Sequence, residues 1–521
     1  MGQAAAARLL TQATFGPTID SITTTSSQSY DAWFIAQAAT TPSLHLPLVP
    51  DKDTDWTQFW FTNAVRGQDQ LRQRMAFALS EILVISNANG PLVNQNQAIA
   101  AYYDILVTNA LGNYRDLLEK VTLSPAMGLY LSMMRNNKPD ITTGIHADEN
   151  YAREIMQLFS IGLVKLNQDG TVQTDSSGRG IATYSQADVE NLARVFTGWG
   201  SNPVNNTGEN AWVFDTDYIN PMVAYANHHD TGAKTIIGNV VVPAGGTAAG
   251  ELKLALDTLF NHPNVGPFIG KQLIQRLVTS NPSPAYVRRV ASTFNNNGQN
   301  VRGDLLAVAK AILTDPEAVS AGGNSYGKLR EPLLKFTQLW RAFNGYDANG
   351  KVAEYMVIHN STRYFAQGPL LSPSVFNFFR PDYQRAGALT TAGLVVPEFQ
   401  TLNESTLVNT SNQLERQAYQ FINSQGHSSG DPNFVYTTNN INNNSVMLHT
   451  TQWEQYANTP ATLIDQLNLV LMSGQMSSAM RQTLIDYVSS VSATTANDTP
   501  GSRVAEAASL IINSPQYSIQ R

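Results

Sequence analysis

The sequence predicts a mainly α-helical protein, and three observations lead to this fold class. Apolar residues recur at helical spacing through most of the chain, several of these segments end in glycine, and strand-like segments are few. The 521 residues also exceed the size at which a single hydrophobic core usually stops growing. We therefore expect a multi-helix array with long irregular loops and one or two short β-hairpins.

Each predicted helix carries an apolar stripe at intervals of three and four residues, which is typical of a helix packed against a core. The predicted helices span residues 4–16, 71–86, 98–112, 149–162, 186–200, 252–260, 266–280, 285–298, 304–318 and 331–345.

Two segments favour strands, namely "TIIGNVVVP" (235–243), read as one hairpin arm, and "NFVYTTNNI" (433–441). Long polar connections separate the helices at 42–56, 167–183, 201–234 and 344–462, and loops of this length are often functional. We expect two units. Residues 1–343 form a helical core domain that carries the motifs, and residues 344–521 form a loop-rich extension that returns to a C-terminal helical segment packed on the core.

Composition excludes several classes of protein. Charged residues make up only 14% of the chain, the net charge is −7, and no run of lysine or arginine could follow a phosphate backbone, which excludes nucleic acid as a partner. The absence of cysteine excludes disulfides, thiolate metal sites and cysteine nucleophiles. No apolar stretch reaches the roughly 18 residues of a membrane span. Serine-hydrolase, P-loop and dinucleotide motifs are absent.

The composition also bears on localisation. A cysteine-free chain rich in asparagine, glutamine, serine and threonine is common among exported bacterial proteins. The first residues, "MGQAAAARLL", lack the basic and apolar regions of a signal peptide. We expect a secreted, periplasmic or cell-surface protein whose signal peptide is absent from this sequence.

The helix predicted at 149–162 concentrates polar side chains on one face. Glu149, Asn150, Arg153, Glu154 and Gln157 fall within about 140° of arc at 100° per residue. One interpretation is a solvated face stabilised by i,i+4 pairs, Glu149 with Arg153 and Asn150 with Glu154. The other is a recognition surface, because planar amide and guanidinium groups suit binding. Amide neighbours and an apolar wall favour a raised pKa for Glu154.

The next helix and the loop after it hold further candidates. Ser185 and Asp188 have capping-box spacing, which predicts a helix start. Trp199, at the end of that helix, is either a platform for a sugar ring or a core residue. His229 and Asp230 precede a short strand that begins near Lys234. These three residues offer imidazole, carboxylate and ammonium groups for acid/base chemistry or substrate binding.

A metal site is a further hypothesis from the same residues. His146 and His229, together with a carboxylate, would supply the nitrogen and oxygen ligands that many metal ions prefer. No compact ligand motif such as H-E-x-x-H is present, so we expect no metal ion or other cofactor as the default.

Eight ordered blocks resemble a bacterial domain-of-unknown-function family, the family numbered 1800. The resemblance runs from about residue 5 to the C-terminus and implies a secreted, mainly helical bacterial protein, often encoded beside a second exported protein. It implies no reaction. The blocks are "RLLTQATFGPT", "LRQRMAFALSEILVIS", "ENYAREIMQLFSIGL", "DVENLARVFTGW", "HHDTGAKTIIG", "HPNVGPFIGKQLIQRLVTSNPSPAYVRRVA", "RGDLLAVAKAILTDPEA" and "PSVFNFFRPDY" with "GLVVPEFQTLNE".

Carried over to this chain, the family pattern coincides with the polar clusters. The family commonly has proline where Ala147 or Asp148 stands, which affects only the helix start. The matching positions are Glu149, Asn150, Arg153, Glu154, Gly198, Trp199, His229, Asp230 and Lys234.

We expect an enzyme that acts on an extracellular polysaccharide by acid/base hydrolysis or elimination. Glu154 or Glu149 would act as acid or base with Asp230 or His229 as partner. The residues expected to hold substrate are Asn150, Arg153, Trp199 and Lys234. One alternative is a non-catalytic cell-surface or matrix scaffold that binds glycan or another exported protein. The other is a metal-dependent enzyme that uses His146 and His229.

Overall fold

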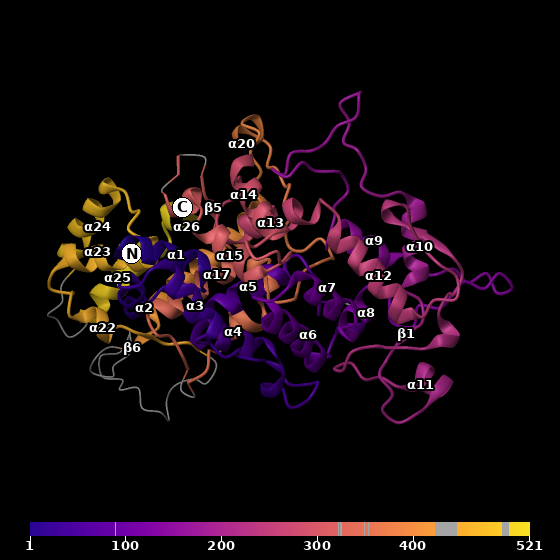
Figure 1. Ribbon diagram of the computed structural model, residues 1–521. Helices are drawn as coiled ribbons and strands as arrows, with labels where there is room; N and C mark the ends of the chain where they lie inside the picture. Colours follow the sequence, from indigo (N-terminus) through magenta and orange to yellow (C-terminus); the bar gives the residue numbers. More distant parts are fainter. Residues whose placement is uncertain are drawn as a thin grey trace.

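The computed structural model describes residues 1–88, 90–320, 322–323, 326–347, 350–352, 354–422, 445–491 and 500–521. Within these ranges helices dominate, and the strands form only two-stranded sheets (Figure 1). This confirms the predicted fold class, a mainly α protein with long irregular connections and short β-hairpins.

The N-terminal helices surround a central one. All eleven residues of α5 are buried, including two arginines and two glutamines, so these polar side chains need partners inside the protein. The helices are α1 (Gln3–Ala13), α2 (Ile19–Ser26), α3 (Tyr30–Ala39), α4 (Thr57–Arg66), α5 (Gln70–Ser80), α6 (Asn96–Asn109), α7 (Tyr114–Thr122) and α8 (Pro125–Tyr130).

The middle of the chain supplies the helices that carry most of the predicted motifs. Ser185 and Asp188 form the expected capping box at the start of α10. The helices are α9 (Asn150–Gln157), α10 (Gln186–Val195), α11 (Gly208–Phe214), α12 (Ala248–Asn261), α13 (Val265–Leu277), α14 (Pro284–Asn295), α15 (Leu305–Leu313), α16 (Pro316–Val319) and α17 (Pro332–Ala342).

The prediction of a long connection at 344–462 is partly wrong, because the 16-residue helix α21 lies within these residues. Its buried face contains Thr406, Thr410, Gln413 and Gln417 beside Leu414, so its period is helical but its chemistry is polar. The helices of this part are α18 (Tyr355–His359), α19 (Ser361–Phe365), α20 (Ala388–Thr391), α21 (Glu404–Tyr419), α22 (Thr451–Glu454), α23 (Pro460–Met472), α24 (Ser478–Ser490), α25 (Pro500–Ile512) and α26 (Pro515–Ser518).

The strands are short and join neighbouring or distant segments in pairs. Segment 235–243 forms most of the β3–β4 hairpin rather than one arm, because Gly238 turns the chain with a positive φ of 71°. The second predicted strand, 433–441, lies outside the described residues. The antiparallel pairs are β1 (Trp199–Gly200) with β2 (Val223–Ala224), β3 (Lys234–Ile236) with β4 (Val240–Val242), and β5 (Lys328–Leu329) with β8 (Ile519–Gln520). The parallel pair is β6 (Phe421–Ile422) with β7 (Leu448–His449).

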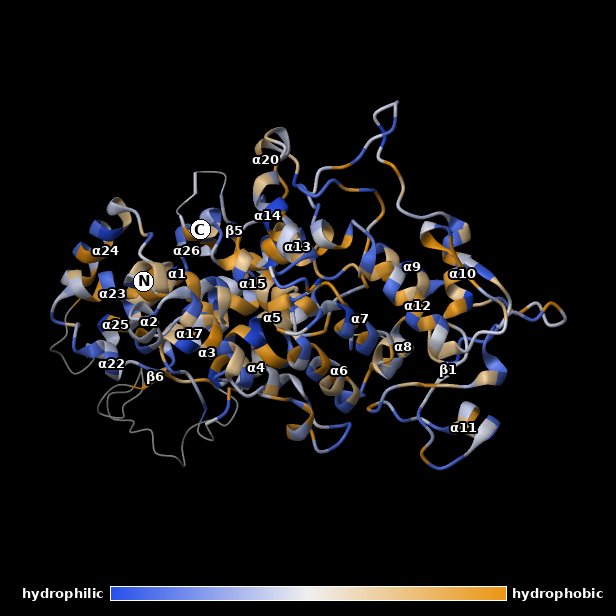
Figure 2. Cartoon of the chain, viewed as in Figure 1, coloured by the Kyte–Doolittle hydropathy of each residue, from blue (hydrophilic) through white to orange (hydrophobic). Residues whose placement is uncertain are grey.

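Figure 1 shows the arrangement of these elements. The C-terminal helices α22 to α25 lie beside the N-terminal α1 and α2 at one end of the molecule, α9, α10 and α12 lie at the other, and α5, α13 and α17 lie between them. Hydrophobic residues gather where the helices face one another (Figure 2), and one cluster of buried apolar residues extends from Ala6 to Tyr517. The division of the chain at residue 343 stays a prediction.

A membrane-spanning helix was not expected from the sequence. Among the described residues, no helix combines the length and the apolar character needed to cross a bilayer.

Candidate functional site

A cavity of about 470 Å³ opens beside α13, between the end of α9 and the segment 375–395. We call it the Glu81 pocket. Its walls are largely apolar, with Leu158, Phe268 and Phe379 among the lining residues, and a small set of polar side chains lies among them. A cavity of this size with apolar walls and a few converging polar groups is typical of a small-molecule site.

Helix geometry brings the polar groups of the pocket together. Lys271, Gln272, Gln275 and Arg276 follow one another on α13 at spacings of one, three and one, so they share one side of the helix. Glu81 is the first residue after α5, where the chain leaves the helix axis. The site therefore combines the end of one buried helix with the side of another.

Gly162 shapes the wall formed by the chain after α9. Its φ is +69°, and a β-carbon at this position would lie 2.8 Å from the ring of Phe268. Only glycine adopts this conformation without strain while allowing such a close approach. The turn at Gly162 thus lets Phe268 pack against the backbone at the edge of the pocket.

Glu81 and Arg276 meet at the floor of the pocket. The Arg276 Nε atom is 3.5 Å from Glu81 Oε2, and both side chains are almost completely buried. The Arg276 guanidinium lies 4.4 Å from the centre of the Phe379 ring and also donates to the Glu81 carbonyl at 3.4 Å. The arginine is therefore fixed by a carbonyl and an aromatic face, while its contact with the carboxyl group is loose.

A buried charge network lies beneath this pair. Lys328 Nζ is 3.1 Å from Oε1 of Glu331 and 3.1 Å from Oε1 of Glu398, and it donates to the Arg276 carbonyl at 2.7 Å. Arg74 donates to the same carbonyl at 2.6 Å. Together with Glu81 and Arg276, the network has three cationic side chains and three carboxyl groups, so protonation of Glu81 leaves one positive charge in excess.

The pKa values of Glu81 and Glu331, two neighbouring glutamates of this network, are displaced in opposite directions. Burial, together with the negative charge of Glu331, raises the pKa of Glu81 to about 8. Burial also opposes ionisation of Glu331, but Lys328, Arg74 and Arg276 outweigh it and lower the Glu331 pKa to about 2. Glu331 is thus the ionised partner of the cations, and Glu81 holds a proton at neutral pH.

Several buried polar atoms around the pocket have no hydrogen bond. Among the described residues, no hydrogen bond is formed by Glu81 Oε2, Arg276 Nε and Nη1, Gln272 Nε2 or Gln275 Oε1, and all four side chains line this one cavity. Buried polar groups almost always have partners in folded proteins, and an unsatisfied group typically costs about 1 to 3 kcal/mol. Their concentration here indicates a place where a ligand or water completes the hydrogen bonding.

The mouth of the pocket is charged. Arg380 and Asp382 are exposed, with 3.6 Å between Arg380 Nε and Asp382 Oδ1. Lys271 lies deeper, and burial lowers its pKa despite the opposing charge of Asp382. An anionic group entering the pocket would meet Lys271 before it reaches Arg276.

The polar face predicted on α9 forms a separate surface cluster. Arg153 donates to Glu149 Oε2 at 2.8 Å, with 40% and 34% of the two side chains exposed, and Gln186 on α10 donates to the same oxygen at 3.0 Å. Asn150 is exposed. Of the two expected i,i+4 pairs, Glu149 with Arg153 is therefore present, with a third polar partner on the neighbouring helix, and the described contacts include none between Asn150 and Glu154. The role of these residues in binding stays a prediction.

Glu154 differs from its neighbours because it faces inwards. Glu154 is only 7% exposed, and its Oε2 atom has no hydrogen bond among the described residues. Burial raises its pKa, with Arg153 acting in the opposite direction. The direction agrees with the sequence-based expectation, although the structure attributes it to burial rather than to amide neighbours.

The predicted loop residues come together in a second buried network. Asp230 accepts two hydrogen bonds from Arg194, at 2.8 and 3.1 Å. Lys234 Nζ is 2.7 Å from Glu251 Oε2, and His229 Nε2 is 3.4 Å from the same oxygen. These side chains are held by internal partners, which favours a positioning role. Their catalytic role stays a prediction, and the described contacts include none between Arg153 and Asp230.

Trp199 and His146 complete the predicted set. Trp199 is buried in β1, where its backbone pairs with Ala224, so its ring belongs to the core rather than to an exposed platform. His146 is exposed, whereas His229 is buried against Thr197 and Glu251. Among the described residues, no three histidine, aspartate or glutamate side chains gather as a metal ion would require.

Sequence reasoning missed Glu81, Arg276 and Glu251. The available signal for the first two was the presence of charged residues within segments that carry an apolar stripe, as in "LRQRMAFALSEILVIS" and "GPFIGKQLIQRLVTS". Charged residues are almost never fully buried without a partner, so such positions predict either an ion pair or a site. The pairing itself joins segments about 200 residues apart and could not be read from local spacing.

Comparison with known proteins gives one result. The family model described as "Protein of unknown function (DUF1800)" matches residues 8–519. No curated protein and no solved structure matches the chain.

Proposed function

Since the chain belongs to the DUF1800 family, whose function is unknown, we propose its activity from the Glu81 pocket: an acid/base enzyme in which protonated Glu81 donates a proton to the substrate. The observation that carries the proposal is the set of buried polar atoms without hydrogen bonds around one cavity, among the described residues, with a carboxyl group of raised pKa among them. Perturbed titratable groups in a cavity are typical of catalytic sites.

The position and proton affinity of Glu81 support the role of general acid. A carboxyl group with a pKa of about 8 holds its proton at neutral pH and can transfer it to a leaving group within hydrogen-bond distance. Proton transfer by a positioned side chain contributes about 10² to 10⁴ to a rate. When Glu81 gives up its proton, Arg276 at 3.5 Å stabilises the resulting carboxylate.

The residues that line the pocket favour a substrate with an apolar part and an acidic or hydroxyl-bearing part. Phe268, Phe376 and Phe379 provide apolar surface for a ring or chain, and Arg276 and Lys271 provide positive charge for an acidic or hydroxyl-bearing group. A sugar ring carrying a carboxylate satisfies both requirements, because its C–H face packs on aromatic rings. The cavity of about 470 Å³ favours the end of a polysaccharide over the middle of a long chain.

We retain the extracellular location as part of the proposal. It is supported by the cysteine-free composition and the low charged fraction of 14%. A non-catalytic glycan-binding or partner-binding scaffold is the alternative, and it predicts ligand binding without turnover.

Activity measurements on Glu81→Gln test the proposal. The wild type is screened against chromogenic aryl glycosides and uronic-acid polysaccharides, with release of the chromophore or formation of the unsaturated product as readout. We expect turnover to fall by about 10²-fold or more in the variant. The wild-type rate should also decline as the pH rises through about 8, where Glu81 loses its proton.

Two further variants separate the candidate acids. Glu415→Gln removes an exposed carboxyl group of α21 and should retain full activity. Glu154→Gln tests the sequence-based assignment. Loss of activity in Glu154→Gln with full activity in Glu81→Gln would move the acid to α9, and binding without turnover across the panel would favour the scaffold.

A further inference from the structure

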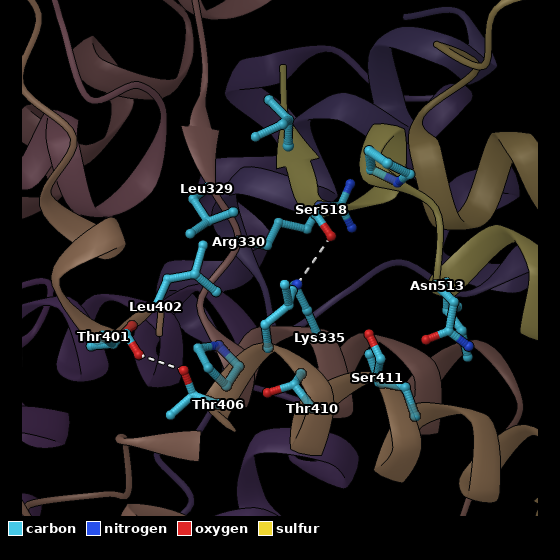
Figure 3. Close-up of a pocket in the computed structure, with 16 residues that line it drawn as sticks. Leu329, Arg330, Lys335, Thr401, Leu402, Thr406, Thr410, Ser411, Asn513 and Ser518 are labelled. Atoms are coloured by element: carbon cyan, nitrogen blue, oxygen red, sulfur yellow. Dashed lines mark hydrogen bonds between the residues drawn. The ribbon is translucent and has the colours of Figure 1, made fainter. Parts of the chain in front are cut away.

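A second cavity, of about 290 Å³, lies at a different place in the fold. It is bounded by α17, by α21 and by the segment 512–519 near the C-terminus. We call it the Lys335 pocket. Figure 3 shows Lys335 reaching from α17 towards Ser518, with Thr406, Thr410 and Ser411 of α21 along the facing wall.

Two cationic side chains line this cavity in a deeply buried position. Lys335 is 8% exposed and Arg330 is 5% exposed. Lys335 Nζ donates to the Ser518 hydroxyl at 3.1 Å, which leaves the ammonium group with donors to spare. Arg330 contacts the Gln338 side-chain oxygen and lies 4.6 Å above the Tyr517 ring, while its Nε has no hydrogen bond among the described residues.

Neither cation has a carboxylate partner among the described residues. Within the part of the chain that the structure describes, no aspartate or glutamate oxygen forms an ion pair with Lys335 or Arg330. The adjacent Glu331 faces the opposite way, to Lys328 and Gln367. Two buried positive charges without a counter-charge are energetically unfavourable, because burial removes their hydration and the neutral groups around them replace only part of it.

The remaining lining suits the rest of an organic molecule. Leu402, Leu407, Leu414 and Ile512 provide apolar surface, and hydroxyl groups of α21 lie among them. An inorganic ion would satisfy the cations but leave this apolar surface in contact with water. A short hydrocarbon that carries an acidic group would satisfy both.

We propose that the Lys335 pocket binds a small organic anion, with its acidic head group between Lys335 and Arg330 and a short apolar chain against the leucines of the wall. The charge state of the cavity supports the same conclusion. Burial and the neighbouring Arg330 lower the pKa of Lys335 to about 8, and a bound anion would restore the preference for the charged form. The Glu81 pocket is distinct, because Glu81 and Asp382 are among its lining residues, whereas the residues that line this cavity include no aspartate or glutamate.

Binding measurements with defined probes test the proposal. Hexanoate and hexyl phosphate carry alkyl chains of similar length with different head groups, inorganic phosphate lacks the chain, and hexanol lacks the charge. By isothermal titration calorimetry on the full chain we expect hexanoate or hexyl phosphate to bind at least tenfold more tightly than hexanol and inorganic phosphate. The tighter of the two identifies the head group.

Variants place the binding in the cavity. Lys335→Met keeps the length of the side chain and removes its charge, and should weaken binding about tenfold or more. Ser411→Phe adds a ring at a half-buried wall position and should block the cavity without removing a buried contact. Lys253→Met, at an exposed lysine of α12, should bind like the wild type.

The opposite results would overturn the proposal. Absence of saturable binding for both hexanoate and hexyl phosphate would do so. Equal affinity for hexanol would do so too, since the cations would then contribute nothing. Unchanged affinity in a folded Lys335→Met or Ser411→Phe protein, with folding checked by circular dichroism, would place any observed binding elsewhere.

Discussion

Replacement of Glu81 by glutamine should change how the stability of the protein depends on pH. In the folded protein the Glu81 pKa is about 8, against 4.5 for an ordinary glutamate. Between these two values the folded state keeps a proton that the unfolded chain has released, so the wild type loses stability as the pH rises from 4.5 to about 8. Because glutamine cannot ionise, the stability of the variant does not fall in this way as the pH rises.

The magnitude follows from the size of the shift. At about 1.4 kcal/mol per pKa unit, the difference between 4.5 and about 8 amounts to about 4 to 5 kcal/mol of unfolding free energy once the pH is above 8. The coupled Glu331 titrates in a different window. Because its pKa is lowered to about 2, its contribution is complete above pH 4.5 and is lost only as the pH falls towards 2.

Urea denaturation followed by tryptophan fluorescence provides the assay, with midpoints at pH 5, 6, 7, 8 and 9. The difference between wild type and Glu81→Gln should grow in favour of the variant from pH 5 to pH 8 and then level off. Glu415→Gln serves as the control for removal of an exposed carboxyl group. Parallel curves for wild type and Glu81→Gln across this range would refute the protonated, buried Glu81.

Three further predictions concern the other charged groups. Arg153→Ala should lower the unfolding free energy by less than about 1 kcal/mol in urea denaturation, because the pair with Glu149 is solvated; a larger loss would indicate a buried role. Lys234→Met should cost about 3 to 5 kcal/mol, since it leaves Glu251 buried without its closest cation, and an unchanged midpoint would contradict this. Lys335→Met should raise stability by about 3 kcal/mol at pH 7, because the Lys335 pKa of about 8 disfavours its charge in the folded state. That gain should shrink as the pH rises from 8 to 10.5, where the unfolded chain also loses the proton, and a gain independent of pH would refute it.

The fold class was predictable because it depends on local periodicity. Apolar spacing in the sequence predicts helices such as α10 and α13, and a capping box also indicates the start of α10. Helix α21 is not predicted by apolar spacing because threonine and glutamine occupy its buried face. There the side-chain amides of Gln413 and Gln417 donate hydrogen bonds to the Glu354 carboxylate. A pattern that scores only apolar residues cannot detect a helix whose buried face is polar.

The candidate site was less predictable for a different reason. Polar clusters in the sequence, such as "HADENYARE", are conspicuous because charged residues stand together. In the Glu81 pocket the charges come from segments far apart in the sequence, with Glu81 after α5 and Lys271 and Arg276 on α13, and become a cluster only when the chain folds. The local stripe of Glu149 and Arg153 was found on α9, whereas Glu81 and Arg276 required the tertiary structure.

The charge network beneath the pocket also has a consequence for how the chain reaches its native state. Arg74 contacts a carbonyl 202 residues away, and Gln367 contacts Glu81 across 286 residues. A growing polypeptide must therefore extend beyond Glu398 before every ionic group of the network has its partner. Until then, water solvates Arg74 and Glu81 better than a collapsed core can, so docking of α5 should be among the last and slowest steps, as expected for contacts distant in sequence.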